Sequence, residues 1–122
     1  MPKILVVDDE PGIRRALRRL VEKRGWEVVE AGTAEDALEV VGQGGIDAAI
    51  CDIRMPGGSG LSFYDEVVKS HPDLRGKIVF LTAAAQESEI QDKVEERGVP
   101  LLSKLYELDL AVDAVAVAVL SK

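Results

Sequence analysis

The chain has 122 residues, the length of one ordinary domain, and 47% of them are hydrophobic, which is enough to build a core. Fifteen basic residues against 22 acidic ones give a net charge of −7, which argues against direct nucleic-acid binding and permits carboxylate clusters that hold a hard cation. One cysteine, Cys51, excludes an internal disulfide and fits a reducing compartment. No segment resembles a signal peptide or approaches the roughly 20 apolar residues of a membrane span, so we expect a cytoplasmic protein without membrane insertion.

The first half of the chain predicts a strand, a helix, a strand and a helix in turn. Lys3–Val7 is a short, continuous apolar run, which favours a buried strand. Pro11 is placed to open a helix whose apolar residues recur at helical spacing, and Gly25 closes it. Glu27–Glu30 predicts a second strand, and Thr33 can cap a second helix, which ends in a glycine-rich segment.

The second half continues the alternation. Ile46–Cys51 predicts the third strand, and a glycine-rich loop separates it from a helix that stops before Pro72. Lys77–Leu81 and Val99–Leu102 predict the last two strands. The two remaining helical patterns, the first of them weak, cover Ser88–Arg97 and Leu108–Leu120.

Strands and helices thus alternate five times, a pattern typical of a parallel sheet with helices on both faces. Three strands are apolar nearly throughout, as strands buried on both faces should be, whereas Glu27–Glu30 is polar at both ends and suits an edge. The sequence contains no internal repeat, low-complexity tract or linker. We therefore expect one α/β domain to fill residues 1–122.

Polar side chains follow four of the predicted strands. Asp8–Asp9–Glu10 comes after the first strand, Asp52 after the third, Thr82 after the fourth and Lys104 near the end of the fifth. Parallel strands bring these ends to one edge of the sheet, where α/β proteins bind ligands. Crowded carboxylates repel one another unless a cation or a proton relieves them, and hard oxygen ligands suit Mg²⁺. With the metal bound, Asp52 can attack a phosphoryl group, whose oxygens the metal, Thr82 and Lys104 can stabilise.

Each of these residues also has an ordinary structural interpretation. Asp9 can be a helix cap, Asp52 a turn residue, Thr82 a second cap and Lys104 a solvated charge. Taken singly, each residue favours the structural interpretation. The position of all four at the ends of successive core strands favours a functional site.

These residues lie in segments that resemble the CheY-like receiver domains of response regulators, the phospho-acceptor modules of two-component signalling. The matching segments are ILVVDDEPGIRRAL, CDIRMPGGSGL, IVFLTA and LLSK, and the resemblance covers essentially the whole chain. It implies a flavodoxin-like (βα)5 fold, a doubly wound parallel sheet with strand order 2-1-3-4-5.

The resemblance also implies a role for each residue of the cluster. Asp52 matches the phospho-accepting aspartate, Thr82 the switch hydroxyl, and Lys104 the lysine that pairs with the phosphoryl group. The Mg²⁺ ligands that it implies are Asp8, Asp9, Asp52 and the backbone carbonyl of Arg54. Met55–Pro56–Gly57 matches the loop that follows the acceptor.

Two positions depart from the family pattern. Leu105 follows Lys104 where the family usually has proline after a cis bond; a non-proline cis bond costs about 3 kcal/mol, so a trans bond and a repositioned loop are expected. Leu101 stands where the family usually has an aromatic ring that swings inward when the threonine moves. The two departures therefore affect how the domain reports its phosphorylated state more than they affect the phosphorylation itself. Arg54 and Ala84 occupy positions that tune the phosphoryl lifetime in the family.

The last predicted helix is apolar nearly all round, with two stripes. They are Val112, Val115 and Val119, expected to face the sheet, and Leu110, Ala114, Val117 and Ala118. A helix of this kind is normally covered on both sides, so we expect a protein-binding or homodimer face here, beside the fourth helix and fifth strand. The alternative is a helix enriched in small residues with modest exposure.

The resemblance implies that Asp52 takes a phosphoryl group, with Mg²⁺, from a histidine kinase or a histidine phosphotransfer protein. The added charge of about −2 would draw in Thr82 and Lys104 and switch the surface of helix 4, strand 5 and helix 5 toward a second copy or an output domain. The basic first helix is either a solvated face or the docking face for the phosphodonor. We expect no enzyme activity beyond self-phosphorylation and dephosphorylation, in a stand-alone regulator or in a piece of a larger regulator or hybrid kinase.

Two rival functions remain open at this point. A phosphorylation-independent interaction module is suggested by Leu101 and Leu105. A small aspartyl-phosphate hydrolase would use Asp52 and Asp9, but that family needs a second aspartate two residues after the nucleophile, where this chain has Arg54.

Overall fold

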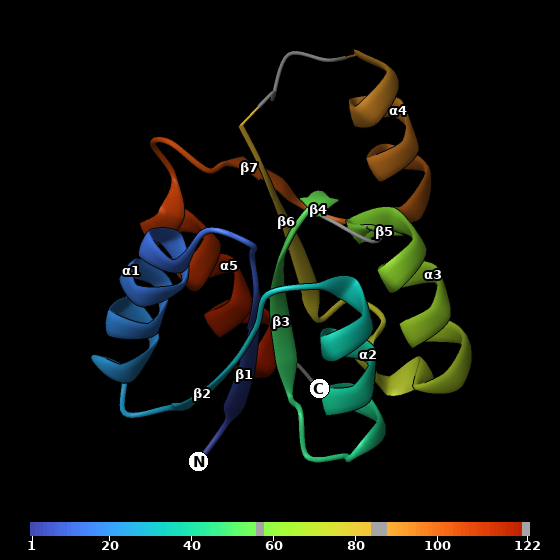
Figure 1. The fold of residues 1–122 in the computed structure, drawn as a ribbon. Helices are drawn as coiled ribbons and strands as arrows, with labels where there is room; N and C mark the ends of the chain where they lie inside the picture. Colours follow the sequence, from blue (N-terminus) through green and yellow to red (C-terminus); the bar gives the residue numbers. More distant parts are fainter. Residues whose placement is uncertain (56–57, 84–87, 121–122) are drawn as a thin grey trace.

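The computed structural model describes residues 1–55, 58–83 and 88–120, and its centre is a parallel sheet (Figure 1). The strands are β1 (Lys3–Val7), β2 (Glu27–Ala31), β3 (Ala48–Asp52), β6 (Ile78–Thr82) and β7 (Leu101–Ser103). They lie in the order β2-β1-β3-β6-β7, and each neighbouring pair is parallel. In terms of the five predicted strands this is the order 2-1-3-4-5, so the flavodoxin-like fold class is confirmed.

Helices cover both faces of this sheet. Within the described residues they are α1 (Pro11–Glu22), α2 (Ala34–Gly42), α3 (Gly60–Ser70), α4 (Ser88–Arg97) and α5 (Leu108–Leu120). Helices α1 and α5 lie on one face, and α2, α3 and α4 lie on the other (Figure 1). Because strand side chains alternate, Ile4 and Val6 of β1 pack with α1 and α5, whereas Leu5 and Val7 pack with the other layer. None of these helices is long and apolar enough to cross a membrane.

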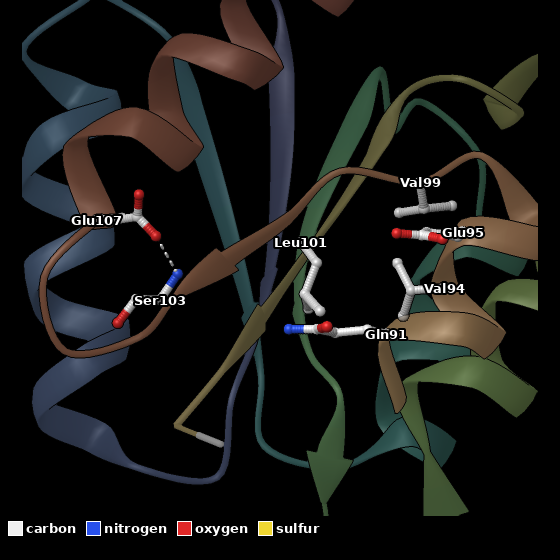
Figure 2. Close-up of a pocket in the computed structure, with 7 residues that line it drawn as sticks. All are labelled: Gln91, Val94, Glu95, Val99, Leu101, Ser103 and Glu107. Atoms are coloured by element: carbon white, nitrogen blue, oxygen red, sulfur yellow. Dashed lines mark hydrogen bonds between the residues drawn. The ribbon is translucent and has the colours of Figure 1, made fainter. Parts of the chain in front are cut away.

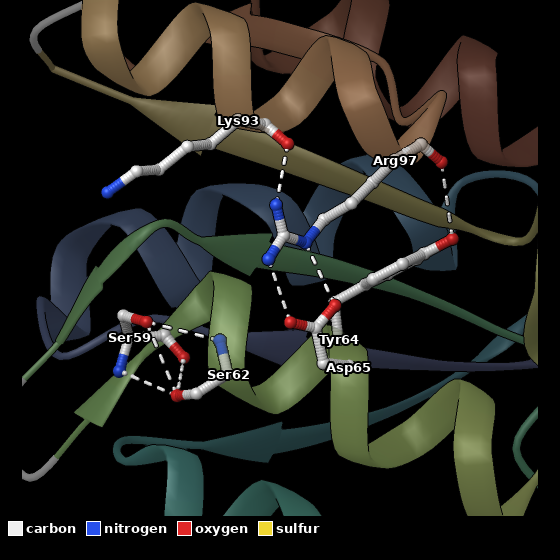
Figure 3. Close-up of polar contacts among 6 residues, drawn as sticks. All are labelled: Ser59, Ser62, Tyr64, Asp65, Lys93 and Arg97. Carbon is white, nitrogen blue, oxygen red and sulfur yellow. Dashed lines mark hydrogen bonds and ion pairs between the residues drawn. The ribbon is translucent and has the colours of Figure 1, made fainter.

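Three helices begin where the sequence supplies a proline or a side-chain cap. Pro11 occupies the first turn of α1, as predicted, and the Thr33 hydroxyl accepts a hydrogen bond from Asp36 N–H at 3.1 Å at the start of α2. Helix α3 begins with a capping box, in which Ser59 and Ser62 each bond the other's backbone N–H (Figure 3). These caps set where the helices leave the strand ends.

Helix α4 has little apolar surface, and polar contacts attach it to α3. Val94 is buried and Ile90 is partly buried, which agrees with the weak pattern in the sequence. The guanidinium of Arg97 donates to both carboxylate oxygens of Asp65 at 2.8 Å, and the Tyr64 hydroxyl lies 3.5 Å from the Arg97 carbonyl oxygen (Figure 3). The position of α4 therefore depends on a small apolar contact and an exposed ion pair.

Three features of the fold differ from the sequence-based expectation. Strand β3 begins at Ala48 instead of Ile46, because Asp47 uses its side chain to accept the Lys3 N–H at 2.8 Å. Strand β7 begins at Leu101, after Pro100, which has no N–H to donate to a ladder. Short elements that the sequence did not predict are β4 (Arg54–Met55), β5 (Gly58–Ser59) and the 3₁₀ turn η1 (Pro72–Leu74).

Candidate functional site

The polar residues at the strand ends lie together at the carboxyl edge of the sheet. Asp8 follows β1, Asp52 ends β3, Thr82 ends β6 and Lys104 follows β7. All four are buried, and they are the buried polar residues of the described part of the chain. Lys104 Nζ lies 2.8 Å from Asp52 Oδ2 and 3.1 Å from Asp8 Oδ1, so one ammonium joins three strand ends. The predicted convergence is confirmed, while the chemical role of each residue stays a prediction.

Lys104 has a third carboxylate partner that the sequence analysis did not identify. Glu10 Oε1 lies 2.6 Å from Lys104 Nζ, although the Glu10 side chain is 61% exposed. Burial lowers the pKa of Lys104, but the hydrogen bonds to Asp52, Glu10 and Asp8 outweigh this effect and raise it well above its usual value. The ammonium is therefore charged at any physiological pH. The signal for Glu10 was its position directly after the aspartate pair.

The two carboxylate oxygens of Asp8 differ in their hydrogen-bond partners. Its Oδ1 accepts the Glu10 N–H at 2.8 Å and contacts Lys104, whereas its buried Oδ2 has no hydrogen-bond partner among the described residues. Burial is the largest influence on this carboxyl group and raises its pKa from 3.8 to about 6. A buried, half-satisfied carboxylate is costly unless a proton or a cation meets the free oxygen.

Asp9 and Glu10 place further carboxylate oxygens close to Asp8. Ligand oxygens of Asp8, Asp9 and Glu10 lie within 4.8 Å of one another, and Asp9 and Glu10 are exposed. A set of hard oxygen donors that leaves room for water is the arrangement that Mg²⁺ prefers. Together with the orphaned oxygen of Asp8, these residues fit the predicted metal.

Asp52 is held through both of its carboxylate oxygens and lines a cavity. Its Oδ1 accepts the Arg54 N–H at 3.1 Å, and its Oδ2 accepts a hydrogen bond from Lys104. The start of α3 packs closely against the same strand end: a Cβ added at Gly60 would lie 2.7 Å from the Asp52 carbonyl oxygen. A cavity of about 240 Å³ opens beside this carboxylate, and its lining residues are Asp9, Glu10, Asp52, Arg54, Thr82, Ala83 and Lys104.

The two positions that depart from the family pattern lie on either side of Lys104. No cis peptide bond occurs in the described residues, so the Lys104–Leu105 bond is trans, as expected. Glu107 shapes the turn that follows: its Oε1 accepts the Ser103 N–H at 2.8 Å (Figure 2). Leu101 is partly buried and lines a second cavity, of about 380 Å³, between β7 and α4 (Figure 2).

Helix α5 is buried on one side and exposed on the other. Ala111, Val112 and Val115 are buried against the sheet, and Val119 packs beside them, as predicted for the first stripe. In the second stripe Leu110 and Val117 are 46% and 68% exposed, whereas Ala114 and Ala118 are partly buried. The interface that we predict on this stripe stays a prediction. Pro56, Gly57 and Ala84, which the resemblance also singled out, lie outside the described residues.

Comparisons with known proteins agree with this geometry. The family model of the response regulator receiver domain matches residues 4–116. Sporulation initiation phosphotransferase F of Bacillus subtilis is 28% identical over 93% of this chain and 90% of its own length. The crystal structure of the response regulator TrrA from Thermotoga maritima, in complex with Mg²⁺-BeF, is 34% identical, covers 97% of this chain and 99% of TrrA, and superposes with a TM-score of 0.83.

Other relatives are much longer than this chain. The sensor kinase CckA of Brucella abortus is 32% identical over 70% of the chain, but the match spans only 9% of CckA. Segments similar to this chain thus occur both in a relative of similar length and in a much longer one. The match over nearly all the chain, the strand order and the buried acid–lysine cluster lead to one conclusion: this chain belongs to the response regulator receiver domain family.

Proposed function

We propose that the chain accepts a phosphoryl group on Asp52 from a phosphohistidine of a histidine kinase or a histidine phosphotransfer protein. An Asp52 carboxylate oxygen forms the bond to phosphorus while the bond from phosphorus to the histidine nitrogen breaks. The observation that carries the proposal is the buried Lys104 ammonium, 2.8 Å from Asp52 Oδ2 beside the strand-end cavity. A positive charge fixed at this place stabilises the charge on the phosphoryl oxygens as the transfer proceeds.

Mg²⁺ is the cofactor that we propose for this transfer. Asp8, Asp9, Asp52 and the carbonyl of Arg54 would hold it, and when bound it would neutralise charge on the phosphoryl oxygens. Support comes from the orphaned Asp8 oxygen and the neighbouring carboxylates, and from the TrrA complex with Mg²⁺-BeF. Lys104 follows β7, whereas Asp8 and Asp9 follow β1, so the ammonium and these metal ligands come from opposite sides of Asp52 in the sheet.

Phosphorylation would be reported through Thr82 and β7. A phosphoryl group adds a charge of about −2, which attracts the Lys104 ammonium and the Thr82 hydroxyl. Thr82 pairs with Ser103 in the sheet, and its carbonyl accepts the Lys104 N–H at 2.9 Å. A movement of Thr82 therefore acts directly on the end of β7 and on the turn before α5.

The partner surfaces that we propose lie on two neighbouring helices, α1 and α5, on the same face of the sheet. The exposed basic residues Arg15 and Arg19 of α1, with Lys23 directly after the helix, suit an acidic phosphodonor. The exposed Leu110 and Val117 of α5 suit a second copy or an output domain. Sedimentation of the chain with and without beryllofluoride tests the homodimer, and a monomer under both conditions would rule it out.

Beryllofluoride with Mg²⁺ also tests the phosphoryl site itself. In ¹H–¹⁵N spectra we expect shifts of the amides of Asp52, Thr82 and Lys104, followed by those of β7 and α5, and no shift in the Asp52→Asn variant. An unchanged spectrum of the wild-type chain would contradict the proposal and favour a phosphorylation-independent interaction module. We expect no turnover of generic phosphomonoesters, and turnover that Asp52→Asn abolishes would instead indicate a hydrolase.

A further inference from the structure

We propose that Arg14 is a positioning residue for the acidic pair Asp8–Asp9, and that Glu30 holds Arg14 in place for this task. The inference rests on the proposed function, because it concerns how the chain presents its carboxylates to Mg²⁺. Arg14 lies in the first turns of α1, and its Nη1 donates to the Asp8 carbonyl oxygen at 2.6 Å. Its Nε donates to Glu30 Oε1 at 3.1 Å, and Glu30 belongs to the edge strand β2.

The Asp8 carbonyl needs a partner of this kind because the β1 ladder has ended. Strand β1 stops at Val7, and the last hydrogen bond on this side is donated by Asp8 N–H to Ala31 O at 3.1 Å. The Asp8 carbonyl oxygen points instead to α1 and is met by the guanidinium. Both peptide groups of Asp8 are thus fixed, one by β2 and the other by Arg14.

Fixing that oxygen also fixes the start of Asp9. The Asp8 carbonyl and the Asp9 N–H belong to one planar peptide group, so the orientation of one sets that of the other. The direction in which the chain enters Asp9 decides where the Asp9 carboxylate lies relative to the Asp8 carboxylate. Partners that orient metal ligands in this way typically change metal affinity by 10- to 100-fold when removed.

Glu30 also provides a matched control. Its other oxygen, Oε2, accepts a hydrogen bond from Arg18 Nε at 2.6 Å, and Arg18 pairs further with Glu22 and not with Asp8. Arg14 and Arg18 therefore share a helix, a charge and a carboxylate partner. They differ in the contact to the Asp8 carbonyl.

The test compares Mg²⁺ affinity in Arg14→Gln and Arg18→Gln by calorimetric titration, with thermal unfolding as a measure of stability. Loss of a positive charge near the carboxylates should by itself tighten Mg²⁺ binding. Positioning predicts the opposite sign: we expect about 10-fold weaker binding in Arg14→Gln. Arg18→Gln should bind as tightly as wild type or slightly more tightly, with a comparable loss of stability.

Arg14→Lys keeps the charge but cannot bridge two acceptors as a guanidinium fork does, so its affinity should fall between those of wild type and Arg14→Gln. In the metal-free protein, the Asp8 and Asp9 amide resonances should shift in Arg14→Gln and stay in place in Arg18→Gln. Equal Mg²⁺ affinity in wild type and Arg14→Gln, or an equal loss in both glutamine variants, would overturn the positioning role alone. A wild-type chain that does not bind Mg²⁺ would contradict the proposed function itself.

Discussion

Replacing Asp8 by asparagine should stabilise the metal-free protein at neutral pH. Asp8 is fully buried with one orphaned oxygen, and burial is the main reason that its pKa rises from 3.8 to about 6. Between about pH 4 and about pH 6 the folded chain therefore binds more protons than the unfolded chain, so the free energy of unfolding falls as the pH rises. The pKa difference amounts to roughly 3 kcal/mol above pH 6, since each tenfold change in the equilibrium is worth about 1.4 kcal/mol.

Urea unfolding at pH 5 and pH 7, without Mg²⁺, measures this effect. Asparagine keeps an oxygen for Lys104 and the Glu10 N–H, so we expect Asp8→Asn to be about 1–3 kcal/mol more stable than wild type at pH 7. This advantage should shrink toward pH 5, and excess Mg²⁺ should stabilise wild type far more than the variant. Asp92→Asn, at an exposed position of α4, is the control and should follow wild type.

Two results together would contradict this cost of burying the Asp8 carboxylate. If Asp8→Asn were no more stable than wild type at pH 7, and the difference between the two did not change with pH, the buried carboxylate would carry no penalty. The interpretation of its free oxygen as a place for a cation would then lose its energetic basis.

Two further pairs of substitutions test contacts next to Asp52 and Lys104. Gly60→Ala should destabilise the chain by about 1–3 kcal/mol, because the new Cβ would lie 2.7 Å from the Asp52 carbonyl oxygen. Gly12→Ala, where nothing lies within 4 Å of a Cβ, should instead stabilise it by about 0.5–1 kcal/mol. Glu107→Ala should lower the free energy of unfolding by about 1 kcal/mol because it removes the acceptor for the Ser103 N–H, while Glu107→Gln should be nearly neutral. Urea unfolding measures all four variants. Equal stability within a pair would contradict the importance of the contact that the pair tests.

Much of the fold follows from local patterns in the sequence. The strand Lys3–Val7, the helix start at Pro11 and the cap Thr33 appear in the structure where they were predicted, because each depends on neighbouring residues alone. The strand ends met as predicted, since parallel strands share a carboxyl edge. The start of β3 was placed two residues early, because the bond from Lys3 N–H to the Asp47 side chain joins residues that are distant in sequence.

The contacts of the site that the sequence does not predict are made by long side chains. Glu10 was noted only as part of the acidic run, and its contact with Lys104 spans most of the chain. From the sequence, Arg14 is one of several basic residues of the first helix, whereas in the structure its guanidinium reaches the Asp8 carbonyl. Residue type and spacing locate such groups, whereas the direction of a long side chain requires the packed neighbours to be known.

Incorporation of a phosphoryl group at Asp52 tests the central claim most directly. The chain would be incubated with Mg²⁺ and a phosphohistidine-bearing donor, and the modified residue would be mapped by mass spectrometry after borohydride trapping of the aspartyl phosphate. We predict one modified residue, Asp52, no incorporation in Asp52→Asn, and strongly reduced incorporation in Lys104→Met and without Mg²⁺. A chain that stays unmodified with several such donors, or that is modified equally well in Asp52→Asn, would contradict the assignment of Asp52 as the phosphoryl acceptor.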